Sequence, residues 1–492
     1  MSRNVITARK GLVSALALAA CLGFSGHAQA ADLGGDCCAD LEERVAELEA
    51  TTVRKGNRKV SLTVSGWVAE QVMWWDDGVE SNAYVVGTGA TLASHFKLTG
   101  QASIAPGYQA GYVIHVETQS ADPFAVTQSN DDATLFPGVS LLQSYWFLNS
   151  DRLGKLSVGK LSHASDNAAI LVDGSGSLVP ANWLMIEGSS FGMRVDKIGL
   201  SGFGSASAGG FNTNIGWGAG IAHCQHISAG IGADCNGIPL NAVRYDSPVF
   251  NGFSVSASWG EDDFWDVAGR YAGEFNGVKV ALSAAYSHQS EEAGSSIGGE
   301  YFNVLGIDIT TNNLRQDSGY LQLGGYIHHV PTGLFVYGAY GKEMNDAVNA
   351  TTLTIYNPQN PSQSTDLGTG FSRGHDNDHW YIKAGLRRKW SPLGHTVLYG
   401  EYGRYNDMYH PALDMIPVLA SSFQRDARVD ISSEMTSWGL GAVQEIDAAA
   451  MSLWLTYRNY SGELNVHMQD VGTLNVDFED LHIVKFGALI NF

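Results

Sequence analysis

In the stretch Leu481-His-Ile-Val-Lys-Phe-Gly-Ala-Leu-Ile-Asn-Phe492, apolar side chains alternate with a mixed set of other side chains up to Phe492. Counting back, every second residue is apolar: Phe492, Ile490, Ala488, Phe486 and Val484. A period of two places this row on one face of a β-strand and the residues between, such as Lys485, on the other. Lipid covers an outward apolar row, so the stretch predicts the closing strand of a barrel in a bilayer.

The same period of two runs through the chain from Val60 onward. It predicts an all-β fold, a transmembrane antiparallel β-barrel of sixteen strands, whose even number leaves both barrel ends on one rim. Eighteen strands are possible if Ser189 to Ser201 and Asn212 to Ala222 also belong to the wall. The predicted strands are 59–75, 91–104, 108–119, 139–149, 154–162, 240–247, 252–260, 264–275, 278–289, 317–329, 334–343, 378–389, 395–407, 432–445, 449–461 and 480–492.

Tight-turn signals mark the short connections. They include Pro106-Gly107, Asn276-Gly277, Pro331-Thr332-Gly333 and Ser391-Pro392-Leu393-Gly394. The other connections are long, polar and rich in Gly, Asn, Asp and Ser. Short turns on one rim and long loops on the other are typical of an outer-membrane barrel.

The composition favours strands over membrane helices. The 492 residues include 58 Gly, 20 Tyr, 19 Phe and 12 Trp, and no later stretch approaches the roughly 18 apolar residues of a spanning helix. Aromatic girdles and Gly-rich loops suit a barrel, although a secreted β-solenoid could share this composition. Removing residues 1–30 leaves 26 basic and 50 acidic groups, a net charge of −24, which argues against a nucleic-acid partner.

Residues 1–30 read as a secretory signal peptide. A basic start precedes an apolar run at 11–20, and Ala28-Gln29-Ala30 forms a small-residue cleavage site. Leu18-Ala19-Ala20-Cys21 is a rival lipoprotein box, which would place a lipid on Cys21. Either reading predicts export.

Residues 31–58 form the next predicted unit, a periplasmic arm. Leu41, Val45 and Leu48 have the spacing of a short coiled coil. A helix of two or three turns is marginal alone in water, so the arm would need partners, and a trimer of chains would supply them. A frayed arm is the alternative.

Export makes disulfides permissible for the four remaining cysteines. Cys224 and Cys235 flank a Gly- and Ala-containing segment, and we predict that they pair. The adjacent Cys37 and Cys38 cannot easily bridge each other, so they would link subunits or stay reduced. Four unpaired thiols are the alternative.

The stretch Asn241-Ala-Val-Arg-Tyr-Asp-Ser-Pro-Val-Phe-Asn-Gly-Phe253 closely resembles the strand, periplasmic turn and strand that follow the constriction loop of Gram-negative general porins. Leu153-Gly-Lys-Leu-Ser-Val-Gly-Lys160 is similar to the strand leading into that loop. Lys59-Val-Ser-Leu-Thr-Val-Ser-Gly66 and Phe492 match the family's first and last strands. The barrel, roughly residues 59–492, carries the resemblance, and with the acidic Cys-Cys arm it looks most like alphaproteobacterial porins.

This resemblance implies a passive, water-filled channel for small hydrophilic solutes and ions in the bacterial outer membrane. It also implies a homotrimer surrounded by lipid and lipopolysaccharide, with no catalysis and no cofactor. We find no catalytic constellation and no zinc spacing in the sequence. A substrate-selective channel, a barrel enzyme, and an envelope tether to peptidoglycan through the arm are the rival functions.

Strand parity selects a basic wall for the pore. Val243 and Tyr245 suit lipid, whereas Arg244 on the other face would cost about 2–4 kcal/mol in hydrocarbon and should face the lumen. The resemblance implies that Arg244 belongs to the basic side of the pore eyelet. A local ion pair without influence on selectivity is the alternative. The same parity places three further basic residues inside: Lys383, Arg387 and Arg458.

The third loop, 163–239, is expected to fold into the barrel and set its bore. Its predicted constriction acids are Asp166, Asp173 and Glu187. Acids facing a basic wall would create a transverse field that orders water and dipolar solutes. Solvated loop acids without such a role are the alternative.

Overall fold

The computed structural model describes residues 60–134, 138–182, 187–194, 211–217, 239–260, 263–292, 300–304, 307–346, 348–355, 365–373, 376–408, 418–419, 426–427, 429–468 and 472–492. The predicted signal peptide, the arm at 31–58 and all five cysteines lie outside these residues. Within them, no helix is long and apolar enough to cross a membrane.

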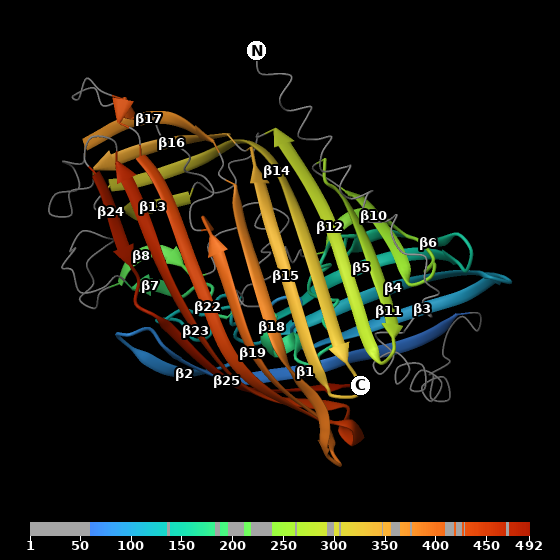
Figure 1. Ribbon diagram of the computed structural model, residues 1–492. Helices are drawn as coiled ribbons and strands as arrows, with labels where there is room; N and C mark the ends of the chain where they lie inside the picture. The colour runs from blue at the N-terminus through green and yellow to red at the C-terminus, as the bar shows by residue number, and fades with distance from the viewer. Residues whose placement is uncertain are drawn as a thin grey trace.

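Sixteen antiparallel strands close into a barrel in the described part of the chain (Figure 1). Each wall strand pairs with the next along the chain, and the last pairs with the first. The wall strands are β1 (Ser61–Asp76), β3 (His95–Ala105), β4 (Tyr108–Gln119), β5 (Gly138–Ser150), β6 (Gly154–Leu161), β9 (Leu240–Asp246), β10 (Phe253–Gly260), β11 (Trp265–Phe275), β12 (Val278–Glu292), β14 (Ile307–His329), β15 (Leu334–Asn345), β18 (Asn377–Ser391), β19 (Gly394–Asn406), β22 (Val429–Ile446), β23 (Met451–Met468) and β25 (Leu481–Asn491).

The sixteen-strand prediction is confirmed, and every predicted strand overlaps one of these wall strands. The eighteen-strand alternative is not supported. Its two extra segments overlap β7 (Gly192–Arg194) and β8 (Phe211–Gly216), which pair with each other in a separate sheet instead of joining the wall.

The seam between β1 and β25 closes the barrel. Trp67 to Asp76 pair with His482 to Asn491, and the backbones of Gly66 and Phe492 exchange two hydrogen bonds of 3.1 and 3.0 Å. Gly66 also pairs with Phe96 of β3, where the His95 carbonyl oxygen would lie 2.1 Å from any added Cβ. A side chain at Gly66 would therefore collide with the neighbouring strand.

The two faces of the closing strand differ as its alternation predicts. Phe486, Ile490 and Phe492 are 57%, 44% and 51% exposed on the outside of the barrel. Leu481 and Ile483 are fully buried on the inside. The outer row is the one that lipid would cover.

The two rims are unequal, as predicted. Tight turns join β3 to β4, β11 to β12, β14 to β15 and β18 to β19 at the predicted sites, and the C-terminus lies at the same lower rim in Figure 1. At the other rim, further strands extend the sheet or form a ribbon, and strand parity alone did not predict them. They are β2 (Ser81–Val86), β13 (Glu300–Val304), β16 (Val348–Ile355), β17 (Thr365–Arg373), β20 (Val418–Leu419), β21 (Asp426–Ala427) and β24 (Gly472–Asp477).

The buried apolar cluster lies inside the barrel, where the segment after β6 meets the wall. Phe191 and Met193 from this segment are fully buried in one cluster with Trp75, Tyr320 and Tyr337 of the wall. The short helix α3 (Leu178–Ala181) belongs to the same segment. Residues 162–182 and 187–194, the inner segment from here on, thus pack against the inner wall.

Candidate functional site

The inner segment is first held by β9 and β11. Asp266 of β11 accepts hydrogen bonds from the backbone N–H and the hydroxyl of Ser165, at 2.6 and 2.7 Å, and pairs with His163 at 2.7 Å. Arg270 donates to the carbonyl of Ala164 at 2.7 Å, and Arg244 donates to the carbonyl of His163 at 3.1 Å. Two guanidinium groups and one carboxylate therefore fix the start of the segment.

The segment then passes along β14 and β15. The Tyr337 hydroxyl of β15 donates to the Ala169 carbonyl at 2.8 Å, and the Ala169 N–H reaches Gln322 at 3.4 Å. Gly324 of β14 makes room for this approach, because an added Cβ would lie 2.3 Å from the Ala169 carbonyl oxygen.

A buried ion pair holds the segment to β18. The Lys383 ammonium lies 2.6 Å from Asp173 and 2.7 Å from the Asn182 amide oxygen, and both charged side chains are fully buried. Asn182 also donates to Asp173 at 2.9 Å. This arrangement satisfies the hydrogen bonds that a buried charge pair needs.

Glu187 sits at the centre of a second buried network on β19, β23 and β25. It accepts a 2.8 Å hydrogen bond from Arg458 and contacts the Lys485 ammonium. Arg458 also pairs with Glu401 at 2.8 Å, and Glu401 accepts from the Tyr381 hydroxyl at 2.6 Å. Lys485 and Arg458 further donate to backbone carbonyls of the short helix region, at Pro180 and Ala181.

The end of the inner segment returns to β1. Arg194 is 1% exposed and lies 2.7 Å from Asp77, just beyond the end of β1. The Gln128 side chain bonds both backbone polar groups of Gly192, at 3.0 and 2.8 Å. The inner segment is therefore held by contacts with wall strands on most of the circumference of the barrel, from β9 to β25 and β1.

The structure places the predicted basic residues on the inner face. Val243 and Tyr245 are exposed on the outside, whereas Arg244 points inward and forms a 2.7 Å ion pair with Asp246 of its own strand. Arg387 pairs with Glu445 of β22 at 3.0 Å. Lys383 and Arg458 form the contacts with Asp173 and Glu187 of the inner segment described above.

The predicted acids differ among themselves. Asp173 and Glu187 touch the basic wall directly, whereas the expected arrangement had acids and bases facing each other across an opening. Asp166 lies on the β9 side, where it accepts a 2.6 Å hydrogen bond from Ser162. Burial raises the pKa of the Asp166 carboxyl, and the charges of His163 and Arg244 act in the opposite direction.

Several functional contacts were missed from the sequence. Lys485 lies on the inward row that the alternation of its strand predicts, but nothing local indicates that it contacts Glu187. Arg270 and Asp266 share one face of β11, opposite the exposed Val267, so the same parity would have found both. Parity likewise places Glu401 on the inner face of β19, but its partners come from β18 and β23 and have no local signal. The predicted Cys224–Cys235 pair lies outside the described residues.

The structure is thus a closed barrel with an apolar outer row and with the inner segment bound inside. A model of the Gram-negative porin family matches residues 15–465. The chain belongs to the Gram-negative porin family. This porin is an outer-membrane channel for small solutes, and its family points to a channel rather than an enzyme. The closer resemblance to alphaproteobacterial porins stays a prediction.

Solved structures similar to this porin come from several bacteria. The anion-selective porin from Comamonas acidovorans is 16% identical, with a TM-score of 0.45 over 88% of this chain and 100% of that one. OmpT, an outer membrane protein of Vibrio cholerae, is 11% identical, with a TM-score of 0.46 over 89% and 99%. OmpF of Salmonella typhi, in complex with daunomycin, is 11% identical, with a TM-score of 0.42 over 89% and 100%. None of the curated proteins matches the sequence.

Proposed function

We propose that this porin conducts ions and small hydrophilic solutes passively through water left between the inner segment and the wall. The observation that carries the proposal is the inner segment itself, bound by buried ion pairs to a closed sixteen-strand barrel. A barrel of sixteen strands encloses an aqueous path, and a segment folded inside the barrel would narrow that path. The inner segment is placed to do so.

Selectivity follows in this proposal from charges that remain near the path. Asp173 and Glu187 are neutralised by their partners, so they hold the segment in place and add little net field. Arg244, Asp246 and Arg270 line the β9–β11 side and are partly exposed, so ions can interact with them. With the acid excess of the whole chain, we expect a weak preference for cations.

Planar-bilayer recording of the pure protein tests this proposal. Stepwise channels whose current is linear in voltage and does not saturate with solute concentration would support it. Saturable block by one solute would instead indicate the substrate-selective channel. Absence of any channel activity from folded protein would refute both.

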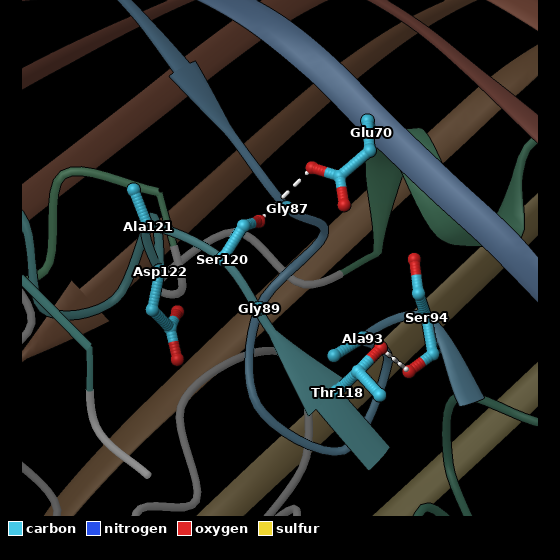
Figure 2. Close-up of a pocket in the computed structure, with 9 residues that line it drawn as sticks. All are labelled: Glu70, Gly87, Gly89, Ala93, Ser94, Thr118, Ser120, Ala121 and Asp122. Atoms are coloured by element: carbon cyan, nitrogen blue, oxygen red, sulfur yellow. Dashed lines mark hydrogen bonds between the residues drawn. The ribbon is translucent and has the colours of Figure 1, made fainter. Parts of the chain in front are cut away.

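We further propose that the porin assembles as a homotrimer through the outer face of β1. Glu70 is exposed on this face between the apolar residues Val68 and Val72. Figure 2 shows Glu70 accepting a hydrogen bond from Ser120, 3.0 Å long, beside a small hollow. A carboxylate at this position is unfavourable against hydrocarbon, and a neighbouring subunit would cover it.

Native mass spectrometry of the detergent complex tests the assembly. The wild-type protein should give three chains per particle, and Glu70→Arg should shift the distribution towards monomers. Ala284→Arg is the control variant, because Ala284 is exposed on β12, on the opposite side of the barrel from β1. A monomeric wild-type protein would refute this assembly. Attachment of the N-terminal arm to peptidoglycan stays a prediction.

A further inference from the structure

Three metal-ligating side chains meet on the inner face of β3 and β4. His95 of β3 lies directly opposite Glu117 of β4, and His115 is two residues along the same strand. Phe96 and Ile114, on the alternate positions, are exposed outside the barrel, so the three polar side chains point inward together. One ligand atom from each lies within 4.8 Å of the others.

The coordinating atoms of this cluster are buried and available. His95, His115 and Glu117 are 9%, 8% and 0% exposed. Nε2 of His115 and Oε1 of Glu117 have no hydrogen-bond partner among the described residues. His95 Nδ1 lies 3.0 Å from the Ala93 carbonyl, which only an N–H can bond, so its Nε2 keeps a lone pair. Buried polar atoms normally have a partner, and a bound cation would supply one.

We propose that His95, His115 and Glu117 form a binding site for a divalent cation of the zinc class. Two imidazole nitrogens and one carboxylate oxygen are typical zinc ligands, whereas Mg²⁺ and Ca²⁺ prefer oxygen alone. Tetrahedral bonds of about 2.0–2.1 Å place ligand atoms about 3.3 Å apart, so the three side chains must close slightly around the ion. A water molecule would take the fourth position.

The surroundings of the cluster indicate what the ion would do. The other Glu117 oxygen accepts the Thr91 N–H at 3.2 Å, and the Trp67 ring packs on His95 at 4.1 Å between centroids. Trp67 also donates to the Leu92 carbonyl at 3.1 Å. Leu92 packs against Ile170 of the inner segment. A bound ion would therefore fix the loop between β2 and β3 against the wall and support the inner segment.

Lys97 is the charged neighbour that opposes binding. It lies on β3 directly opposite His115, on the same inner face as the cluster. Its ammonium would repel a cation, and removing that charge should tighten binding without touching a ligand. This gives a test that does not depend on damaging the site.

Zinc binding is measured on the full chain in detergent, after EDTA treatment and dialysis, by competition with a chromophoric zinc indicator. We expect a wild-type site that His115→Gln and Glu117→Gln each weaken at least about tenfold, by analogy with other metal sites. Lys97→Gln should strengthen it by about threefold or more. His328→Gln, an inward histidine of β14, is the matched control and should leave the affinity unchanged.

Heat-modifiable migration on gels confirms that each variant is folded, and zinc should raise the transition temperature of the wild type but not of His115→Gln. Equal zinc affinity in the wild type, in both ligand variants and in Lys97→Gln would overturn the proposal. Comparable binding of Mg²⁺ at the same concentration would also overturn it, because it would indicate a nonspecific carboxylate site.

Discussion

Among the inward residues, Arg244 is the one whose substitution should change the ion selectivity of the current most directly. Arg244→Ala leaves Asp246 without its 2.7 Å partner, so one negative charge is added to the inner face. A unit charge about 10 Å from a passing ion contributes about 0.4 kcal/mol in water, a factor of about two in the permeability ratio. The reversal potential in a salt gradient should shift towards greater cation preference.

Arg404→Ala is the control for this change. Arg404 also forms a close ion pair, 2.6 Å from Glu434. Its side chain lies on the outer face of β19, whereas the next residue, Tyr405, is buried on the inner face. Its removal should leave the reversal potential unchanged. An unchanged potential in Arg244→Ala as well would remove Arg244 from the ion path.

At the residue scale, parity predicts the direction of a side chain but not its partner. Arg244, Lys383 and Arg458 all point inward as the alternation of their strands predicts. Nothing local shows that Lys383 meets an acid 210 positions earlier in the chain. The cluster of His95, His115 and Glu117 was missed for the same reason, because the register of β3 and β4 brings it together.

At the level of the elements, we expect the contact with β18 to contribute the largest share of the free energy that holds the inner segment to the wall. Lys383→Met leaves Asp173 buried without its cation, which typically costs about 3–5 kcal/mol. The double variant Lys383→Met with Asp173→Asn should recover most of that loss, because no unpaired charge remains. The temperature of the heat-modifiable transition measures both effects.

Lys389→Met is the matched control on the same strand. Its pair with Asp447 is about half exposed, and such pairs contribute about 1 kcal/mol or less. A loss in Lys383→Met no greater than in Lys389→Met would show that the buried pair does not hold the inner segment.

Gly324 and Gly325 are adjacent in β14 and lie on opposite faces of the wall: Gly324 faces the inner segment, whereas Gly325 lies on the outer face. In Gly324→Ala the new methyl group meets the Ala169 carbonyl, whereas at Gly325 the nearest atom is a Leu282 methyl carbon at an ordinary 3.5 Å. Overpacking of this kind costs about 1–3 kcal/mol. Single-channel current should become noisier in Gly324→Ala and match the wild type in Gly325→Ala. Equal noise in all three proteins would contradict this contact.

The elements themselves were largely predictable, and the reasons are physical. Each wall strand must alternate because lipid covers one face, and tight turns need residues such as Asn276 and Gly277, whose φ angles are 50° and 78°. Strands such as β16 and β17 stand beyond the barrel wall in Figure 1, where no membrane imposes a pattern. Their prediction would need knowledge of the neighbours with which they pair.

For the whole molecule, closure of the barrel should depend on the glycine at its seam. Gly66→Ala places a methyl group 2.1 Å from the His95 carbonyl oxygen, beside the two hydrogen bonds to Phe492. We expect about 1–3 kcal/mol of destabilisation and a lower heat-modifiable transition temperature. Gly269→Ala on β11 is the control, because no atom lies within 4 Å of its added Cβ. Equal stability of the two variants would show that the seam tolerates the crowding.

The partners of Glu187 also order the events of assembly. Arg458 and Lys485 follow it by 271 and 298 positions, so both contacts require parts of the chain that are far apart in sequence to meet. Contacts this distant in sequence form late, since closing the intervening chain costs entropy before any contact is made. We therefore expect docking of Glu187 to be a late step of folding, and a barrel that β23 and β25 have not yet joined would hold the Glu187 carboxylate without its two cations.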